Sequence, residues 1–367
     1  MAAGLYIHIP FCKQKCNYCD FASFAGQENR IENYLTALRQ EAAQHPAANC
    51  RTLYVGGGTP SLLSCSQLEK LIALIETHAA PIPAFTESTF EANPESLTPQ
   101  KIHLLHSAGF NRFSVGLQSF NDAELHTLGR VHSVADFLRV WKDLRAGGVA
   151  NINVDLIAGL PGQTAESFRQ SLNQLLALAP EHISVYGLQI EEGTPFFEQG
   201  FVCDQLLMRA MLEDTRNRLI QAGYHHYEIS NFARPGYESK HNLNYWQYGK
   251  YTGWGSAAAS FNGRTRKQNI SSLSQYIQCI GGHKDPVSFS ETLTGKAREG
   301  EKLMVGLRQL DGVVLTPAQH RFFDEEIQKH LQNGLLIKDG KKVKLSEEGL
   351  FLANEVFYSF VAPFEDP

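Results

Sequence analysis

The chain has 367 residues, of which 43% are hydrophobic, and a formal net charge of −5 at pH 7. Its length predicts one large domain with a smaller one, and the absence of a basic block argues against a protein that coats nucleic acid. No apolar run reaches the roughly 18 residues of a membrane span, and the first residues lack the pattern of a signal peptide. Seven cysteines in a chain without such a leader favour a reducing cytoplasm.

Strand-like and helical segments alternate through the first 205 residues. Short β-branched runs predict strands at 5–9, 52–56, 85–93, 110–118, 151–159 and 182–190. Amphipathic stretches between them predict helices. The helix predicted at 67–78 has a capping box of Ser66 and Glu69, and the helix predicted at 136–148 has a C-cap at Gly147–Gly148. The alternation predicts parallel strands with helical crossovers. Six such units are two short of a full barrel, so the predicted fold class is α/β, a partial (β/α)6 barrel.

A chemically distinctive group ends or follows each predicted strand. In chain order, these groups are the cysteines after the first strand, Gly56–Gly57–Gly58–Thr59, Glu91 with Asn93, Gln118, Asp155 and Gln189. In β/α barrels the loops after the strands converge at the C-terminal rim, where the chemistry gathers. We therefore expect an active or binding site on that rim.

The pattern changes after residue 205. Residues 224–261 are rich in aromatic side chains, and 263–269 and 281–286 are predicted as surface loops. Two helical patterns and a hairpin signal around Asp339–Gly340 then resemble a winged helix, but its basic residues cluster only in the wing, which disfavours DNA binding. The predicted parts are a barrel at 1–205, an aromatic-rich extension at 206–294 and a small winged-helix-like α+β domain at 295–367.

Cys12, Cys16 and Cys19 lie within one tight loop after the first predicted strand. Thiolates spaced this closely let one loop wrap an iron–sulfur cluster, as in ferredoxin-type sequences. A zinc ion is the alternative, and it would need a fourth ligand from His8 or Asp20. The other four cysteines are interpreted as small buried hydrophobic residues.

Two further features of the rim suit a small polar ligand. The glycines at 56–58 allow the backbone to approach a ligand closely, although no phosphate-binding Gly-Lys-Ser/Thr follows them. Glu91 and Asp155 stand in otherwise apolar strands, where a carboxylate can accept hydrogen bonds from an ammonium group or a ribose hydroxyl. Alternatively, each of these carboxylates caps the next helix.

The spacing Cys-x3-Cys-x2-Cys resembles the signature of radical S-adenosylmethionine (SAM) proteins. That resemblance implies a 4Fe–4S cluster held by three thiolates, with SAM bound to the fourth iron. It also implies one-electron cleavage of SAM to a 5′-deoxyadenosyl radical, for which the protein supplies geometry and electrostatics.

The resemblance becomes more specific over nearly the whole chain. The oxygen-independent coproporphyrinogen III oxidase family, and in particular its HemW branch of heme chaperones, has strings similar to YIHIPFCKQKCNYCDF, GGGTPSLL, EANPES, FSVGLQSF, LGRVHS, VDLIAGLPGQT and HNLNYW. The resemblance to this family implies a SAM site made of Tyr6, Tyr18, Gly57, Gly58, Thr59, Glu91, Gln118, Arg130 and Asp155.

Two features decide the branch. The oxidases of this family carry a fourth cysteine where this chain has Phe21, and phenylalanine neither binds iron nor donates a proton, so oxidase activity is put in doubt. The string HNLNYW is associated with heme binding in the HemW branch, and it implies His241 as a heme ligand beside the flat rings of Tyr245 and Trp246. Many relatives have a histidine where this chain has Ala259, which implies a weaker or differently built heme site here.

Two functions of different classes follow from the resemblance. The first, which we favour, is a chaperone that binds heme and transfers it to an acceptor hemoprotein, with a 4Fe–4S cluster and an exchangeable SAM. The alternative is a radical SAM oxidoreductase acting on a tetrapyrrole, which the complete SAM motif keeps open. We also expect an electron donor such as a flavodoxin or ferredoxin, a cytoplasmic location and no nucleic-acid partner. Whether the protein forms a homodimer is left open.

Overall fold

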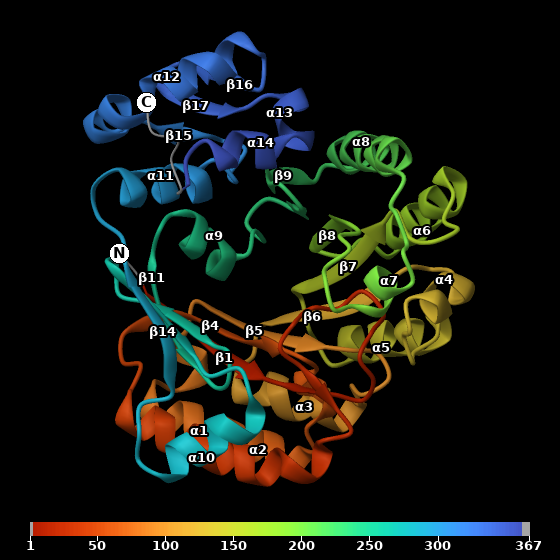
Figure 1. Ribbon diagram of the computed structural model, residues 1–367. Coiled ribbons are helices and arrows are strands. Elements are labelled where there is room, and N and C mark those ends of the chain that lie inside the picture. The colour runs from red at the N-terminus through yellow and green to blue at the C-terminus, as the bar shows by residue number, and fades with distance from the viewer. Residues whose placement is uncertain (1–2, 362–367) are drawn as a thin grey trace.

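The computed structural model describes residues 3–361, which are built around one twelve-stranded mixed sheet. Its central strands run parallel in the order β1 (Ala3–Ile9), β4 (Cys50–Gly57), β5 (Glu87–Ala92), β6 (Arg112–Gln118), β7 (Ile152–Ala158) and β8 (His182–Gly187). These strands overlap the six predicted segments and curve into a partial barrel (Figure 1). The predicted α/β fold class is confirmed.

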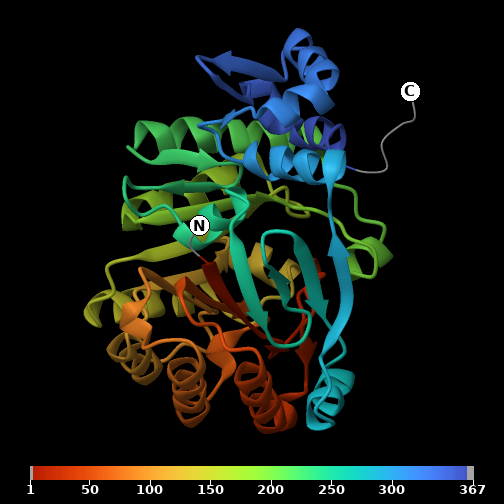
Figure 2. The same ribbon diagram turned by 90° about the vertical axis from the view of Figure 1, so that its left-hand side faces the viewer.

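Helices join the parallel strands and cover the outer face of the barrel (Figures 1 and 2). They are α1 (Ile31–Gln44), α2 (Cys65–His78), α3 (Pro99–Ala108), α4 (Asp122–Thr127), α5 (Val134–Ala146) and α6 (Ala165–Leu178). Each of the longer ones buries an apolar stripe in one large core, and a fully buried leucine such as Leu38 or Leu172 contributes about 1.5–3 kcal/mol there. Within residues 3–361, no helix has the length and apolar character needed to cross a membrane.

Two helix ends differ in how well the sequence predicted them. The N-cap of α2 is Ser64, whose Oγ accepts the backbone N–H of Gln67, while the Gln67 side chain accepts the N–H of Ser64. The predicted capping box of Ser66 and Glu69 is therefore wrong by two residues, because the Ser64 pair satisfies the same motif earlier. Helix α5 ends as predicted at Gly147–Gly148.

Short strands extend the sheet at both edges of the barrel. β11 (Lys250–Trp254) pairs in parallel with β1 and continues into antiparallel β12 (Ala259–Phe261), β13 (Thr265–Asn269) and β14 (Val287–Thr292), while β10 (Asn231–Ala233) and β9 (His225–Glu228) extend β8. The predicted loop at 263–269 is thus wrong over β13. Its side chains are mostly polar, and this concealed a strand whose stability comes from pairing with its two neighbours.

A small α+β unit with its own hydrophobic core forms the C-terminal part (Figure 1). It contains α11 (Gly295–Gly306), β15 (Val313–Val314), α12 (Pro317–Gln332), β16 (Leu336–Asp339), β17 (Lys342–Leu345), α13 (Glu347–Phe351) and α14 (Ala353–Tyr358). The β16–β17 hairpin turns at Gly340, whose φ of 59° lies in the left-handed region that favours glycine. The predicted winged-helix-like unit is confirmed.

This C-terminal unit rests on α8 (Gln205–Gln221) and α9 (Lys240–Trp246). Arg209 of α8 forms a bidentate ion pair with Glu348 of α13, with N–O distances of 2.5 and 2.8 Å. The guanidinium of Arg308 stacks over the ring of Trp246, 4.5 Å from its centroid. Helix α9 is thereby held between the barrel and α11 (Figure 1).

Candidate functional site

The three clustered cysteines lie in a loop that follows β1. Cys12 ends β2 (Phe11–Cys12), which pairs with β3 (Phe24–Ala25) and so closes the loop that carries Cys16 and Cys19. All three are free thiols and line one cavity of about 140 Å³ at the C-terminal rim of the barrel. Burial raises the pKa of the Cys12 and Cys19 thiols, so a bound cation is needed to favour the thiolates there.

The same cavity gathers nearly all of the predicted SAM residues. Its lining includes Tyr18, Gly57, Gly58, Thr59, Glu91, Gln118, Arg130 and Asp155. Tyr6 is the exception, because its side chain lines a larger neighbouring cavity instead. The ends of β4, β5, β6 and β7 converge here, as expected for a β/α barrel.

Gly57 and Gly58 form a close-fitting backbone wall beside the cysteine loop. A Cβ on Gly57 would lie 2.5 Å from Nδ1 of His8, and one on Gly58 would lie 3.0 Å from Sγ of Cys12. Gly57 also has a φ of 116°. Only glycine fits these positions, and the backbone consequently approaches the cavity without an intervening side chain.

Arg130 is a half-buried cation next to the thiols. Its Nη2 donates to the carbonyl oxygen of Gly116 and to Oδ1 of Asn93, at 2.7 and 2.8 Å, and its Nη1 lies 3.7 Å from Sγ of Cys16. These bonds hold the positive guanidinium of Arg130 beside Sγ of Cys16, where it would stabilise the negative charge of a thiolate. Asn93 also lines the cavity, although it was not among the predicted SAM residues; its place in the string EANPES was the available signal.

Glu91 and Asp155 do not cap the helices that follow them. The side chain of Thr98 caps α3 and that of Thr164 caps α6, each by accepting a backbone N–H of the first turn. The capping alternative for the two carboxylates is therefore wrong. Both carboxylates instead line the cavity of the cysteines.

Hydrogen bonds hold both carboxylates in place. Glu91 accepts from the Tyr54 hydroxyl at 2.5 Å and from the Gly57 N–H at 3.1 Å, and Asp155 accepts from Nδ2 of Asn153 at 2.8 Å. Burial raises the pKa of Glu91 to about 7 and also raises that of Asp155. An ammonium group entering the cavity would favour their charged forms.

Gln118, at the end of β6, combines a strained backbone with an unsatisfied polar atom. Its φ of 75° lies in the left-handed region, which is uncommon for a residue with a side chain. Its Oε1 is buried and has no hydrogen-bond partner among the described protein atoms. Since buried polar atoms are usually paired, this oxygen suits a ligand that brings a donor into the cavity.

These residues fit a 4Fe–4S cluster with SAM better than a zinc ion. They supply thiols, a backbone wall, half-buried carboxylates and an unpaired amide oxygen around one cavity. His8, a candidate fourth zinc ligand, uses Nδ1 with the Tyr6 hydroxyl and Nε2 with the carbonyl oxygen of Ala22. In the described part of the chain, no three His, Cys, Asp or Glu side chains are close enough to hold a single metal ion.

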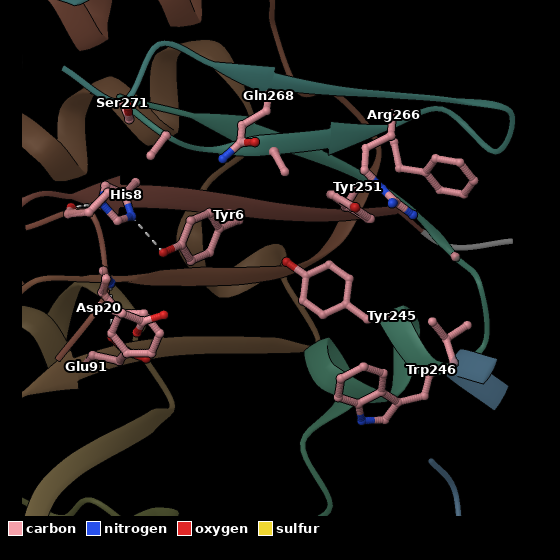
Figure 3. A pocket seen from close by; sticks show the side chains of 18 of the residues that line it. Tyr6, His8, Asp20, Glu91, Tyr245, Trp246, Tyr251, Arg266, Gln268 and Ser271 are labelled. Carbon is pink, nitrogen blue, oxygen red and sulfur yellow. Dashed lines mark hydrogen bonds between the residues drawn. The ribbon is translucent and has the colours of Figure 1, made fainter. Parts of the chain in front are cut away.

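A second cavity of about 690 Å³ adjoins the first, within the range of about 300–1,000 Å³ typical of small-molecule sites. Its lining includes Tyr6, His8, Asp20, Tyr245, Trp246, Tyr248, Tyr251, Ala259, Phe261, Arg266, Gln268 and Val305, many of which are shown in Figure 3. Most of these residues come from β1, α9, β11, β12, β13 and α11, which are far apart in the sequence. Aromatic rings dominate the walls and suit a large planar ligand.

Phe21, Gly57 and Glu91 line both cavities. Phe21 is 65% exposed, which is unusual for so large an apolar side chain. The residue that stands in place of a fourth cysteine thus lies where the two cavities meet.

His241 lies behind the wall of the larger cavity and does not line it. Its Nδ1 is 2.9 Å from Oγ1 of Thr52 and its Nε2 is 2.8 Å from the hydroxyl of Tyr245, so both ring nitrogens are engaged. Burial lowers the pKa of His241 to about 3, which keeps the imidazole neutral. The wall itself is formed by Tyr245, on the same helix.

The chain is similar in sequence to radical SAM proteins and to heme chaperones. The model of the radical SAM superfamily matches residues 6–175. The heme chaperone HemW of Bacillus subtilis is 36% identical over 97% of this chain and 98% of its own length, and HemW of Escherichia coli is 38% identical over 70% and 69%. The mitochondrial radical S-adenosyl methionine domain-containing protein 1 of Mus musculus is 33% identical over 99% of this chain and 88% of its own length.

Among solved structures, coproporphyrinogen III oxidase (HemN) from Escherichia coli, a radical SAM enzyme, has a TM-score of 0.86. The match covers 98% of this chain and 90% of that chain at 24% sequence identity. This likeness establishes the fold along nearly the whole chain.

Proposed function

Because this chain belongs to the HemW family within the radical SAM superfamily, we propose that it binds heme and transfers it to an acceptor hemoprotein, carrying a 4Fe–4S cluster with an exchangeable SAM. The larger cavity is the observation that carries this proposal. Its tyrosine and tryptophan walls suit a porphyrin, and it adjoins the cavity of the three cysteines.

In this proposal Cys12, Cys16 and Cys19 bind three irons as thiolates, and Arg130 offsets part of their negative charge. When bound, the reduced cluster supplies an electron to the sulfonium of SAM. The chain's own residues then have positioning roles. The backbone at 57–59 approaches SAM, and Oε1 of Gln118 accepts a hydrogen bond from it.

The two carboxylates complete the proposed SAM site. Glu91 accepts from an ammonium group and Asp155 from a ribose hydroxyl, while Tyr18 lies on the wall beside them. Tyr6 faces the neighbouring cavity, so it would reach SAM only where the two cavities meet.

His241 is the proposed heme ligand, and the structure sets a condition on that role. Its Nε2 must exchange the hydroxyl of Tyr245 for iron. The imidazole is already neutral, as a metal ligand has to be. The hydroxyl of Tyr245 therefore has to leave Nε2 before iron can approach.

A radical SAM oxidoreductase acting on a tetrapyrrole is the second candidate. It is favoured by the three residues shared by both cavities, since a tetrapyrrole in the larger cavity would lie beside SAM in the smaller one. Phe21 argues against the coproporphyrinogen III oxidase reaction, because its ring has no group that binds iron or transfers a proton.

Anaerobic reconstitution with iron and sulfide, followed by two assays on one preparation, separates the two candidates. We expect stoichiometric heme uptake with transfer to an apo-hemoprotein, and no product from coproporphyrinogen III with SAM and a reductant. Turnover of coproporphyrinogen III would favour the second candidate, and absent heme uptake would refute the first. Tight binding of one zinc per chain without iron–sulfur absorption would refute the cluster.

The remaining partners are part of the same proposal. A flavodoxin or ferredoxin would reduce the cluster in the cytoplasm, and a homodimer would form through the cysteine loop, whose Phe21 is exposed. Light scattering before and after reconstitution tests this proposal. If the dimer forms, the measured mass doubles when the cluster is present.

A further inference from the structure

The larger cavity has one permanent positive charge on its wall. Arg266 of β13 is the only lysine or arginine among its lining residues, and His8 is kept neutral because burial lowers its pKa. The carboxyl groups of Asp20 and Glu91 also line this cavity. A ligand that carries carboxylates would be repelled by either acid in its ionised form, so its own carboxylates are best placed at Arg266.

Arg266 and the turn before β13 are hydrogen-bonded to helix α11 of the C-terminal unit. Nη2 of Arg266 donates to Oε1 of the buried Glu301 on α11, and the hydroxyl of Tyr248 donates to the other carboxylate oxygen at 2.7 Å. Arg298 of the same helix donates to the carbonyl oxygen of Gly263 at 3.2 Å, which ties α11 to the turn before β13. These contacts orient the guanidinium before any ligand arrives.

The guanidinium has donors to spare. Its bond to Glu301 uses Nη2, and a planar guanidinium presents further N–H groups in a fork that matches a carboxylate. The side chain remains 35% exposed and lies near Tyr251 on the cavity side of the sheet (Figure 3). A second carboxylate can therefore bind from the cavity while Glu301 stays in place.

We propose that Arg266 recognises a carboxylate of the ligand in the larger cavity and thereby sets the ligand's orientation. This inference rests on the proposed heme binding and deepens it. The apolar macrocycle of heme suits the aromatic walls, and a propionate side chain suits Arg266. A propionate on Arg266 determines which edge of the macrocycle faces Phe21 and the cysteine cavity.

The test compares hemin with hemin dimethyl ester, which keeps the macrocycle but has no carboxylate. Reconstituted wild-type protein is expected to bind hemin about 10- to 100-fold more tightly than the ester, as for a hydrogen-bonded charged pair. Arg266→Gln is expected to lose this preference while binding the ester as wild type does. Lys267→Gln is the matched control, because it removes the same charge from the next residue of β13, which does not line the cavity.

Arg266→Gln leaves Glu301 buried without its cation, so the double variant Arg266→Gln, Glu301→Gln is measured beside it to keep the interior neutral. It too is expected to lose the preference. Equal affinities of the wild type for hemin and its ester, or a preserved preference in both variants, would overturn the role of Arg266 alone. Uptake of neither compound by the wild type would overturn the proposed heme binding, and this inference with it.

Discussion

Nε2 of His241 lies 2.8 Å from the hydroxyl oxygen of Tyr245, one turn later on α9. Of these two residues, Tyr245 lines the larger cavity and His241 does not. If His241 binds heme iron, the tyrosine hydroxyl and the iron compete for the same nitrogen. His241→Ala is then expected to weaken heme uptake by at least about 10-fold, or about 1.4 kcal/mol, with the iron–sulfur absorption unchanged. Titration of the Soret band measures the heme affinity.

Tyr245→Phe is the companion variant, since it frees Nε2 and keeps the ring on the wall. It should bind heme at least as tightly as wild type. Unchanged affinity in His241→Ala would remove His241 from the site and leave the residues that line the cavity as the sources of the iron ligand.

Cys16→Ala is expected to abolish the cluster. Its thiol lines the smaller cavity next to Arg130, and two thiolates cannot hold the three irons. Visible absorption and iron content after anaerobic reconstitution measure the loss. Cys65→Ala is the control, because Cys65 begins α2 away from this cavity, and it should reconstitute fully. Equal iron content in both variants would contradict the assignment of the loop.

Glu91→Gln is expected to weaken SAM binding by about 10-fold, because a neutral amide attracts an ammonium group less than a carboxylate does. Burial raises the pKa of Glu91 to about 7, so the wild-type carboxylate becomes protonated as the pH falls through that value. Wild-type SAM affinity should therefore fall below about pH 7. Equilibrium dialysis of the reconstituted protein at several pH values measures both effects.

Glu166→Gln, which changes an exposed carboxylate on α6, controls for the loss of charge. The proposed contact between Glu91 and SAM fails if Glu91→Gln binds SAM as tightly as this control.

Ala259→Phe should block heme uptake by filling the larger cavity, which Ala259 lines. The added ring would occupy space proposed for the porphyrin, whereas the proposed cluster site is the other cavity, so the cluster should stay intact. Ser290→Phe adds the same ring to an exposed position of β14 and should leave heme uptake unchanged. Full heme uptake by Ala259→Phe would place the heme elsewhere.

Glu41 of α1 gives a prediction about stability. It is buried and accepts hydrogen bonds from Tyr276, Gly255 and Asn269, yet burial raises its pKa from 4.5 to about 7. The folded state therefore keeps a proton that the unfolded chain releases between these values, and the free energy of unfolding falls as the pH rises through this window. The loss is about 3 kcal/mol by linkage and is complete above about pH 7.

Glu41→Gln removes that titration, so its unfolding free energy should depend less on pH than that of wild type. Urea denaturation across this window measures the difference. Glu32→Gln, on the exposed side of the same helix, should keep the wild-type dependence. A parallel pH dependence in wild type and Glu41→Gln would show that Glu41 does not titrate there.

The barrel was predictable because its signals are local. Each parallel strand is a short apolar run followed by an amphipathic helix, and this pattern identifies both elements from neighbouring residues alone. Strand β13 was missed because Arg266, Lys267 and Gln268 are polar, and their strand conformation depends on partners elsewhere in the chain. Two similar Ser-x-x-Glu/Gln motifs at the start of α2 made the choice of cap ambiguous.

The two cavities also differ in how far the sequence alone predicts them. The cysteines, Glu91 and Asp155 could be grouped in advance because the C-terminal ends of parallel strands always meet at one rim. The larger cavity is enclosed by residues as distant as Tyr6 and Val305, and no local pattern brings those together. The burial of His241 behind Tyr245 likewise depends on how α9 sits against β4, which the string HNLNYW does not encode.

Phe21, Gly57 and Glu91 belong to both cavities, and this has a thermodynamic consequence. Two ligands that share wall residues cannot bind independently once either of them shifts those residues. Whatever factor SAM imposes on the dissociation constant of heme, heme must impose on that of SAM. If SAM and heme bind as proposed, the shared wall would make their affinities reciprocal, without any signal having to travel through the rest of the molecule.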